Sequence, residues 1–476
     1  MAKPTTLAAD FPPAREEDWR ALVAKTLGDK PFESLASATV DGLPVAPLYP
    51  ASPAAALPGL RPYDAERPWD IRVITAHPDP RAANREILRD LEGGAASVLL
   101  RLDPTGRTGV AVGSPDGLAA ALDGVILELA PVALDAGFLG PKAADWLGSI
   151  AKASPGAKLQ FHLDPLSAFA ELGASPGPVE SHVISAATVA ARMAETYPQA
   201  GLFLASGRVV HEAGGGEAQE LAVMLASALA YAKALVRAGL PMDQAFRRIT
   251  LGLAADGEYF LTIAKLRAAR ALWARLVEAC EVAAPARIEA RSSRRMLAAR
   301  DPWTNMLRLT AAGFGAAVGG ADIVVLGNFT DALGLPTAFA RRQSRNTQLV
   351  LMEEAHVGRV LDPGAGSGYL EVLSDELARA AWAAFQAIEA RGGLVQALSD
   401  GQVAAELDRA RQAREAAGTP KIVGVTAFPP DRAEDVEIER PTPRAVDAPS
   451  PRLPGPDGAC PPLAPIRLAE PFEAAR

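Results

Sequence analysis

His211 follows the end of a predicted strand, and its imidazole is the side chain there best suited to proton transfer near neutral pH. It stands in the run SGRVVHEAG, residues 206–214, directly after the apolar run 202–206. Its imidazole could act as an acid, or it could form only a hydrogen bond to backbone. Further polar side chains near the ends of predicted strands are Asp103, Glu128, Asp164, Ser206, Asp256 and Asn328. Because they show no recognisable triad, metal cluster or carboxylate pair, we expect most of them to cap loops.

Two glycine-rich segments could contact a phosphate or a nucleotide. The run VLDPGAGSG, residues 360–368, resembles the turn of S-adenosylmethionine-dependent methyltransferases. That fold needs several further strands after the turn, but only one short apolar run, residues 394–398, follows, so a tight loop is the better interpretation. Residues 214–216 (GGG) precede a predicted helix, but Glu217 and Glu220 in its first turn would repel a phosphate.

Composition excludes several other functions. Cys280 and Cys460 are the two cysteines and form no C-x-x-C motif, which argues against a zinc site or a disulfide framework. The net charge is −8, with Lys and Arg interspersed among acids, so we expect no nucleic-acid partner. The N-terminal residues contain no apolar signal core and no apolar run reaches membrane-spanning length, so we expect a cytoplasmic protein without a membrane partner.

Strand-like and helix-like segments alternate from about residue 94. The longest helical patterns cover residues 217–238 and 259–282, and two more helices are predicted over 375–391 and 400–417. Eight strands with intervening helices indicate an α/β fold of the (β/α)8 TIM-barrel type, with a doubly wound open sheet as the alternative. The eight predicted strands are 97–102, 124–129, 158–163, 181–185, 202–206, 248–254, 287–291 and 323–326.

The barrel is predicted to occupy residues 66–427, between two irregular segments. Residues 1–65 form an N-terminal arm, with a helix over 16–27 and a hairpin over 37–45 whose turn is Asp-Gly. Residues 428–476 are rich in proline and cannot form a packed domain. We expect this tail to be either disordered or an extended strap laid on a partner.

Four segments, in the same order along the chain, resemble the cobalamin-dependent methylmalonyl-CoA mutase family. Residues 67–72 (RPWDIR) resemble the family's R-P-W-x-I-R, and residues 206–221 resemble S-G-Y-H-x-x-E-A-G…Q-E-L. The third segment is AKLRAARALW, residues 264–273. The longest match combines FTDALGLPT (329–337), NTQLVLMEE (346–354) and RVLDP (359–363), which resemble the late barrel segment of the family.

The resemblance also shows that several catalytic elements of the family are missing. The family's tyrosine position is Ile74 and its histidine position is Val209, and neither side chain can exchange a proton. The family's S-Q-T-S-G signature is replaced by residues 292–295 (SSRR), and its substrate-arginine segment is absent from residues 181–189. Arg67 and Arg72 persist as remnants of the face that contacts coenzyme A in catalytic chains. No catalytic residue is therefore assigned, and His211 is the one remaining candidate.

The same comparison bears on the cofactor. None of the five histidines lies in the family's cobalt-binding motif D-x-H-x-x-G, and too few residues follow Ala427 for a cobalamin domain. The resemblance thus implies a small (beta) subunit that binds neither cobalamin nor a metal, paired in a heterodimer with a catalytic large subunit. That large subunit would carry adenosylcobalamin and interconvert methylmalonyl-CoA and succinyl-CoA. The alternative is a stand-alone TIM-barrel enzyme that acts on an acyl-CoA with an altered active site.

Overall fold

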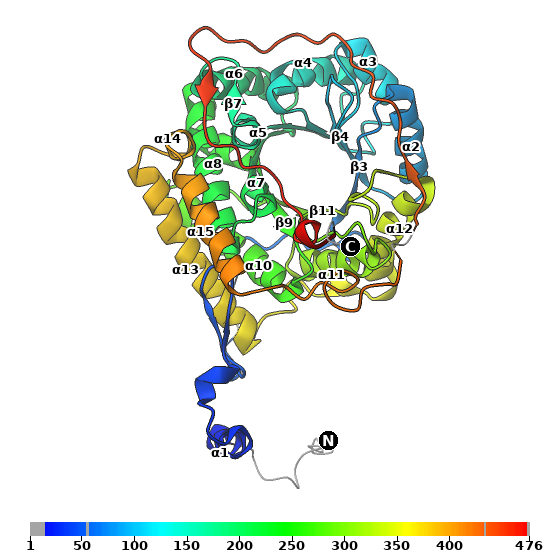
Figure 1. The fold of residues 1–476 in the computed structure, drawn as a ribbon. Coiled ribbons are helices and arrows are strands. Elements are labelled where there is room, and N and C mark those ends of the chain that lie inside the picture. The colour runs from blue at the N-terminus through cyan, green and yellow to red at the C-terminus, as the bar shows by residue number, and fades with distance from the viewer. Residues whose placement is uncertain (1–14, 54–56, 433–434, 474–476) are drawn as a thin grey trace, which may run out of the picture.

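A closed barrel of eight parallel strands forms the body of the protein in the computed structural model, which describes residues 15–53, 57–432 and 435–473 (Figure 1). The strands follow one another around the barrel in the order β10-β11-β3-β4-β5-β6-β8-β9, and helices surround them. The predicted TIM barrel is thereby confirmed. The barrel strands are β3 (Asp70–Thr75), β4 (Ser97–Arg101), β5 (Val132–Asp135), β6 (Leu159–Leu163), β8 (Gly201–Ser206), β9 (Ile249–Ala255), β10 (Ile288–Ser292) and β11 (Ile323–Val325).

Two of the eight predicted strands are wrong. Residues 181–185 lie within helix α6 (Val179–Thr196), where His182, Val183 and Ala186 are buried at helical spacing. Residues 124–129 form turns, and Leu129 is 72% exposed. Short runs that contain apolar residues suit a helix or a turn as well as a strand. The two barrel strands that are missing from the eight predicted ones are β3 and β5.

Helices follow most strands, and capping side chains mark several of their starts. Asp79 accepts hydrogen bonds from the backbone N–H groups of Arg81 and Ala82 at the start of α2, and Thr337 caps α12. Helix α13 begins at Gly368 rather than at the predicted Asp375. The helices of the body are α2 (Pro80–Glu92), α3 (Pro115–Ala121), α4 (Gly140–Ala151), α5 (Pro165–Leu172), α6, α7 (Arg208–Glu212), α8 (Glu217–Arg237), α9 (Met242–Arg247), α10 (Tyr259–Ala279), α11 (Asn305–Val318), α12 (Ala338–Leu349), α13 (Gly368–Ala390), α14 (Leu394–Ser399) and α15 (Gln402–Ala416).

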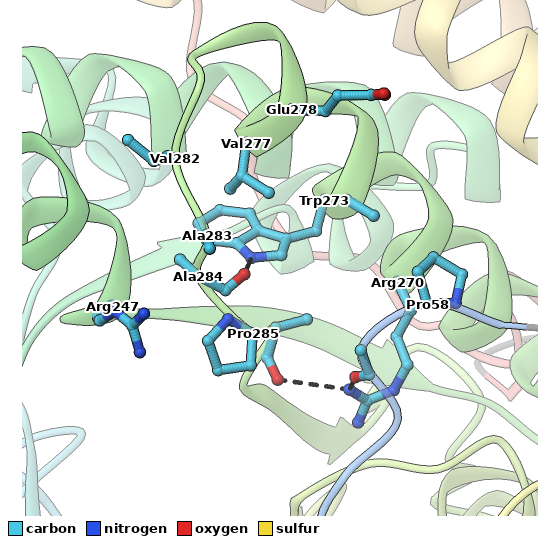
Figure 2. Close-up of a pocket in the computed structure, with 13 residues that line it drawn as sticks. Pro58, Arg247, Arg270, Trp273, Val277, Glu278, Val282, Ala283, Ala284 and Pro285 are labelled. Carbon is cyan, nitrogen blue, oxygen red and sulfur yellow. Dashed lines mark hydrogen bonds between the residues drawn. The ribbon is translucent and has the colours of Figure 1, made fainter.

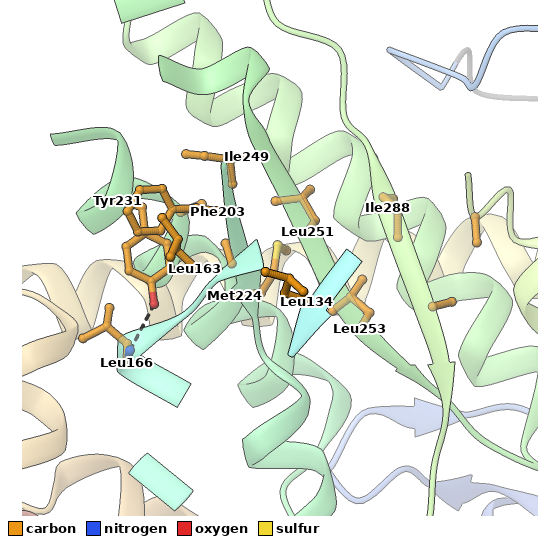
Figure 3. Close-up of a cluster of buried hydrophobic side chains, with 14 of the residues drawn as sticks. Leu134, Leu163, Leu166, Phe203, Met224, Tyr231, Ile249, Leu251, Leu253 and Ile288 are labelled. Atoms are coloured by element: carbon orange, nitrogen blue, oxygen red, sulfur yellow. Dashed lines mark hydrogen bonds between the residues drawn. The ribbon is translucent and has the colours of Figure 1, made fainter. Parts of the chain in front are cut away.

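The main hydrophobic core lies between the strands and the surrounding helices. Figure 3 shows Leu134, Leu163 and Leu251 of the strands beside Met224 and Tyr231 of α8. Among the described residues, α8 is the one helix long and apolar enough to cross a membrane. However, 67% of its qualifying stretch is buried inside the structure, as is usual for a core helix.

The part of the N-terminal arm that contains its helix extends away from the barrel (Figure 1). Its helix α1 (Glu16–Leu27) has no buried side chain, and Trp19 makes an edge-to-face contact with Phe32 at a centroid distance of 5.7 Å. The predicted hairpin is present as β1 (Ser37–Ala38) and β2 (Pro44–Val45). At the hairpin turn, Asp41 accepts hydrogen bonds from the backbone N–H groups of Glu217 and Ala218, which fixes the arm to the start of α8.

The proline-rich segment lies against the chain's own barrel (Figure 1), where we had expected disorder or a strap on a partner. Strand β13 (Ile438–Glu439) pairs with β12 (Leu335–Pro336), and β14 (Gly458–Ala459) pairs with β7 (Ala174–Ser175). The same segment also contacts the connections that follow β4, β8 and β10. There the backbone N–H groups of Val446, Ile466 and Leu468 donate to the carbonyl oxygens of Pro104, Glu212 and Arg295, respectively. We call residues 435–473 the strap.

Candidate functional site

His211 lies on α7, at the carboxyl end of β8, where TIM barrels place their reactive groups. Its side chain is fully buried. Nε2 lies 3.0 Å from Ser293 Oγ and 3.2 Å from Asp256 Oδ2, and Nδ1 lies 3.2 Å from Glu220 Oε2. The ring therefore contacts side chains from three other elements, rather than the backbone that we considered in the sequence analysis.

Both carboxylates beside His211 are stabilised in their ionised form. Burial alone would raise the pKa of Glu220, but the charges of Lys265 and His211 outweigh it and hold the pKa at about 2. Lys265 Nζ lies 2.6 Å from Glu220 Oε2. Burial likewise acts against the charge of Asp256, but His211 and Arg295 keep its pKa well below the ordinary range. The carboxylates of this cluster are paired with His211, Lys265 and Arg295, although His211 Nδ1 and Arg295 Nε have no hydrogen-bond partner among the described residues.

Ser293, His211 and Glu220 follow the order of a nucleophile, a base and an orienting acid, but their environment prevents nucleophilic catalysis. Ser293 is fully buried, and its Oγ accepts a hydrogen bond from Arg295 N–H. The strap also crosses this side of the barrel mouth, where Ile466 and Leu468 bond to the backbone of Glu212 and Arg295. A substrate atom has no route to the hydroxyl in this conformation.

Ile74 and Val209 stand where the family resemblance predicts that catalytic groups are lost. Both side chains pack against hydrophobic clusters. Ile74 on β3 packs against an inner cluster that includes Leu99 and Ala133. Val209 on α7 is partly buried against the main core. Both side chains serve packing, and neither has a polar atom to present to a substrate.

A chain of ion pairs crosses the inside of the barrel. Glu289 on β10 binds Arg72 of β3 at 2.6 Å and Arg291 of β10 at 2.6 Å. Arg291 then reaches Asp135 at 3.0 Å. Because β5 is four strands from β10 in either direction around the barrel, the Arg291–Asp135 pair spans the barrel axis. These side chains lie in the interior of the barrel, which we call the channel.

The charges in this channel stabilise one another. Burial disfavours the ionised form of Glu289, but Arg291 outweighs that effect and keeps its pKa well below the ordinary value. His162 on β6 is also buried, and burial lowers its pKa to about 3, so the ring is neutral at pH 7. Neither ring nitrogen of His162 has a hydrogen-bond partner among the described residues. A neutral imidazole thus sits beside the ion pairs without joining them.

Arg67 and Arg72 do not come together as a binding face. Arg67 is exposed in the loop before β3, where its backbone N–H donates to Asp64. Arg72 is fully buried and bound to Glu289, Ser97 and Asp70. The sequence motif therefore holds the barrel together at Arg72 and leaves Arg67 at the surface.

Three of the six polar strand-end residues, Asp103, Asp164 and Ser206, accept hydrogen bonds from backbone N–H groups that follow them in the chain. Asp103 accepts hydrogen bonds from Thr105 and Thr108, and Asp164 caps α5 through Ser167 N–H. Glu128 lies in the turns before β5, so it does not follow a strand as predicted. Within the described residues no group of three or more His, Cys, Asp or Glu could hold a metal ion.

A cavity of about 480 Å³ lies at the opposite end of the barrel, between the end of α10 and the start of β10 (Figure 2). Trp273 and Val277 form an apolar wall, and Arg247 lies at its edge. Trp273 donates a hydrogen bond to the carbonyl of Ala284. None of the candidate site residues lines this cavity, although Arg270 and Trp273 belong to the matched segment 264–273.

Sequence reasoning missed the channel residues Glu289, Arg291 and Asp135. The signal was present in the run IEARS, where charged residues alternate with apolar ones inside a strand that parallel barrels usually make apolar. Their partners could not have been found, because β3 and β5 meet β10 only in the closed barrel.

Comparison with known proteins agrees with this architecture. Residues 58–450 match the family model described as methylmalonyl-CoA mutase. The methylmalonyl-CoA mutase small subunit of Streptomyces virginiae is 40% identical over 94% of this chain and 76% of its own length. That of Propionibacterium freudenreichii subsp. shermanii is 35% identical, over 92% of this chain and 72% of its own length. A probable methylmalonyl-CoA mutase small subunit of Mycobacterium bovis is 42% identical over 78% of this chain and 62% of its own length. This chain belongs to the methylmalonyl-CoA mutase family.

Proposed function

We propose that this chain is the non-catalytic small subunit of a heterodimeric methylmalonyl-CoA mutase. The observation that carries the proposal is the ion pair between Arg291 and Asp135, which spans the barrel axis. Ile74 and Val209 stand where catalytic chains of the family carry a tyrosine and a histidine, and both are apolar packing residues here. In the heterodimer, the larger chain would interconvert methylmalonyl-CoA and succinyl-CoA.

Adenosylcobalamin is assigned to the larger chain because the histidines of this chain do not fit a cobalt ligand. His162 and His211 are buried inside the barrel and its mouth. His182 bonds to the carbonyl of Pro176, and His77 accepts a hydrogen bond from Asp79 N–H. His356 is exposed just before the short turn Val357–Arg359. No step of the reaction is therefore attributed to this chain.

The arm supplies a surface for the larger chain. Helix α1 projects from the barrel with Leu22 65% exposed, and it packs against the short turn at Phe32–Leu35. An isolated helix of this length is marginally stable in water, so a partner that covers its apolar side would stabilise it. We place the assembly in the cytoplasm.

The alternative of a stand-alone acyl-CoA enzyme gains no support from His211, because both ring nitrogens face carboxylates that are already paired. It would require a substrate channel, and the channel residues are bound to one another.

A pull-down from the native cell tests the proposal. We expect the tagged chain to recover a larger cobalamin-carrying chain at a one-to-one ratio, with mutase activity that depends entirely on that chain. Leu22→Asp should weaken recovery, whereas Leu129→Asp should not, because Leu129 is equally exposed but lies far from the arm in the turn before β5. Recovery of this chain alone, active on an acyl-CoA, would overturn the proposal.

A further inference from the structure

Three arginines follow or end strands β4, β8 and β10 at the carboxyl end of the barrel. Two of them lie beside Asp135: Arg291 at 3.0 Å, and Arg101 as its register partner on β4. Arg101 ends β4, Arg291 lies near the end of β10, and Arg208 begins α7 after β8. Although burial disfavours the ionised form of Asp135, the charges of Arg291, Arg101 and Arg208 together hold its pKa below the ordinary value. Glu289 pairs with Arg291, and Glu212 lies 3.9 Å from Arg208, so the group contains charges of both signs.

Two guanidinium nitrogens in this group have no hydrogen-bond partner among the described residues. They are Nη2 of Arg291 and Nε of Arg208. Arg291 is only 4% exposed, and its other groups already bind Glu289 and Asp135. A buried N–H of a charged group without an acceptor is costly, so each such donor calls for an oxygen atom.

Arg208 is the less firmly held of the two. Its nearest carboxylate, on Glu212, is 3.9 Å away, which is beyond hydrogen-bond distance. Burial lowers the pKa of Arg208, and the neighbouring charge of Arg291 lowers it further. A negative charge placed between the two guanidinium groups would remove this repulsion.

Solvent reaches the group from the barrel mouth. The side chain of Asp135 is 38% exposed and that of Arg208 is 20% exposed. An ion can therefore enter from this side, although the channel beneath is closed by the Arg291–Asp135 pair.

We propose that the barrel mouth binds a small oxyanion, a carboxylate or a phosphate, between Arg208 and Arg291, with Arg101 at the rim. The oxygens of the anion accept hydrogen bonds from the two unpartnered nitrogens. Guanidinium groups suit both ligands because their N–H groups match the spacing of carboxylate and phosphate oxygens. The site belongs to this chain alone and is independent of a larger partner.

Titration calorimetry on the purified full chain tests the site with three probes: inorganic phosphate, acetate and succinate. We expect saturable binding of at least one probe, weakened by added salt because the attraction is between charges. Binding of phosphate alone assigns a tetrahedral anion, and binding of acetate or succinate alone assigns a carboxylate. Binding of both classes assigns a general oxyanion site. No saturable heat with any probe overturns the proposal.

Arg208→Gln removes the charge at the less firmly held position, and we expect it to weaken binding by about tenfold or more. Arg101→Gln should weaken it by a smaller factor, and it provides a second test if Arg208→Gln does not fold. Arg379→Gln is the matched control, since its side chain is 79% exposed on α13. Equal affinity of the wild-type and Arg208→Gln proteins would place the anion elsewhere and overturn the proposal.

Discussion

Nη1 of Arg291 lies 3.0 Å from Oδ2 of Asp135, across the barrel from the opposite strand. The same arginine holds Glu289, which in turn holds Arg72 on β3. One chain of charges therefore links β3, β5 and β10. A packed, charged interior can hold a barrel closed, but it cannot also serve as a substrate channel.

Glu289 is the centre of this chain of charges, and its removal should be strongly destabilising. Glu289→Ala leaves Arg72 and Arg291 without their shared partner in a fully buried site, so we expect a loss of about 3 to 5 kcal/mol. Asp135→Ala should cost only about 1 to 2 kcal/mol, because Asp135 is 38% exposed and Arg291 keeps Glu289. Urea unfolding gives both values. An equal cost for the two substitutions would contradict the assignment of Glu289 as the centre.

Asp41 should make the stability of the protein depend on pH. Burial, and then the charge of Glu217, raise its pKa from 3.8 to about 6. A raised carboxyl pKa means that the folded state binds the proton more tightly than the unfolded state. The contribution of Asp41 is therefore complete below about pH 4 and is lost as the pH rises through about 6.

Asp41→Asn should remove the loss of stability that accompanies ionisation of Asp41. Its amide oxygen can still accept hydrogen bonds from the N–H groups of Glu217 and Ala218. Relative to wild type, we expect the variant to gain about 1 to 2 kcal/mol at pH 7 and nothing near pH 4. Comparing the two proteins at each pH cancels the titration of other groups, such as Glu220. Asp41→Ala is the control, because it loses the helix cap at both pH values. A variant less stable than wild type at pH 7 would show that the carboxylate charge is favourable there.

The substitution Gly113→Ala should detach the strap from the loop that contains Gly113. A Cβ at this position would overlap the carbonyl of Asp447 in the strap, and backbone cannot swing aside as a side chain can. We expect Gly113→Ala to raise hydrogen exchange at Val446, whose N–H donates to Pro104 at 2.8 Å. Gly117→Ala in α3 is the matched control, since the nearest atoms there are 3.7 Å away and alanine favours a helix. Unchanged exchange in Gly113→Ala would mean that the strap does not lie against this loop.

The sequence predicted the barrel because strands buried on both faces leave near-continuous apolar runs, as at 202–206 and 248–254. It failed at 181–185, because a five-residue run with two β-branched residues, Val183 and Ile184, fits a helix equally well. Only the longer burial pattern of α6 decides between a helix and a strand. Ile74 and Val209 could be located from motifs, since each lies within a few residues of a matched segment.

The environment of His211 could not be predicted in this way. Its contacts come from Glu220 on α8, Asp256 after β9 and Ser293 after β10, which approach one another only when the barrel closes. The sequence shows that these residues can be charged or polar. Whether they form a reactive centre or only pair with one another depends on the distances between their side chains, which no sequence spacing encodes.

Restoring the two missing catalytic side chains should not restore catalysis. In the double variant Ile74→Tyr, Val209→His, the tyrosine and the histidine return to the family's positions, but Arg291 and Asp135 still cross the channel. We therefore expect no conversion of methylmalonyl-CoA by this chain, even with added adenosylcobalamin. The assay needs the larger chain as a positive control and circular dichroism to show that the variant is folded. Turnover by the folded double variant alone would mean that the channel admits an acyl-CoA, and the non-catalytic role would then have to be abandoned.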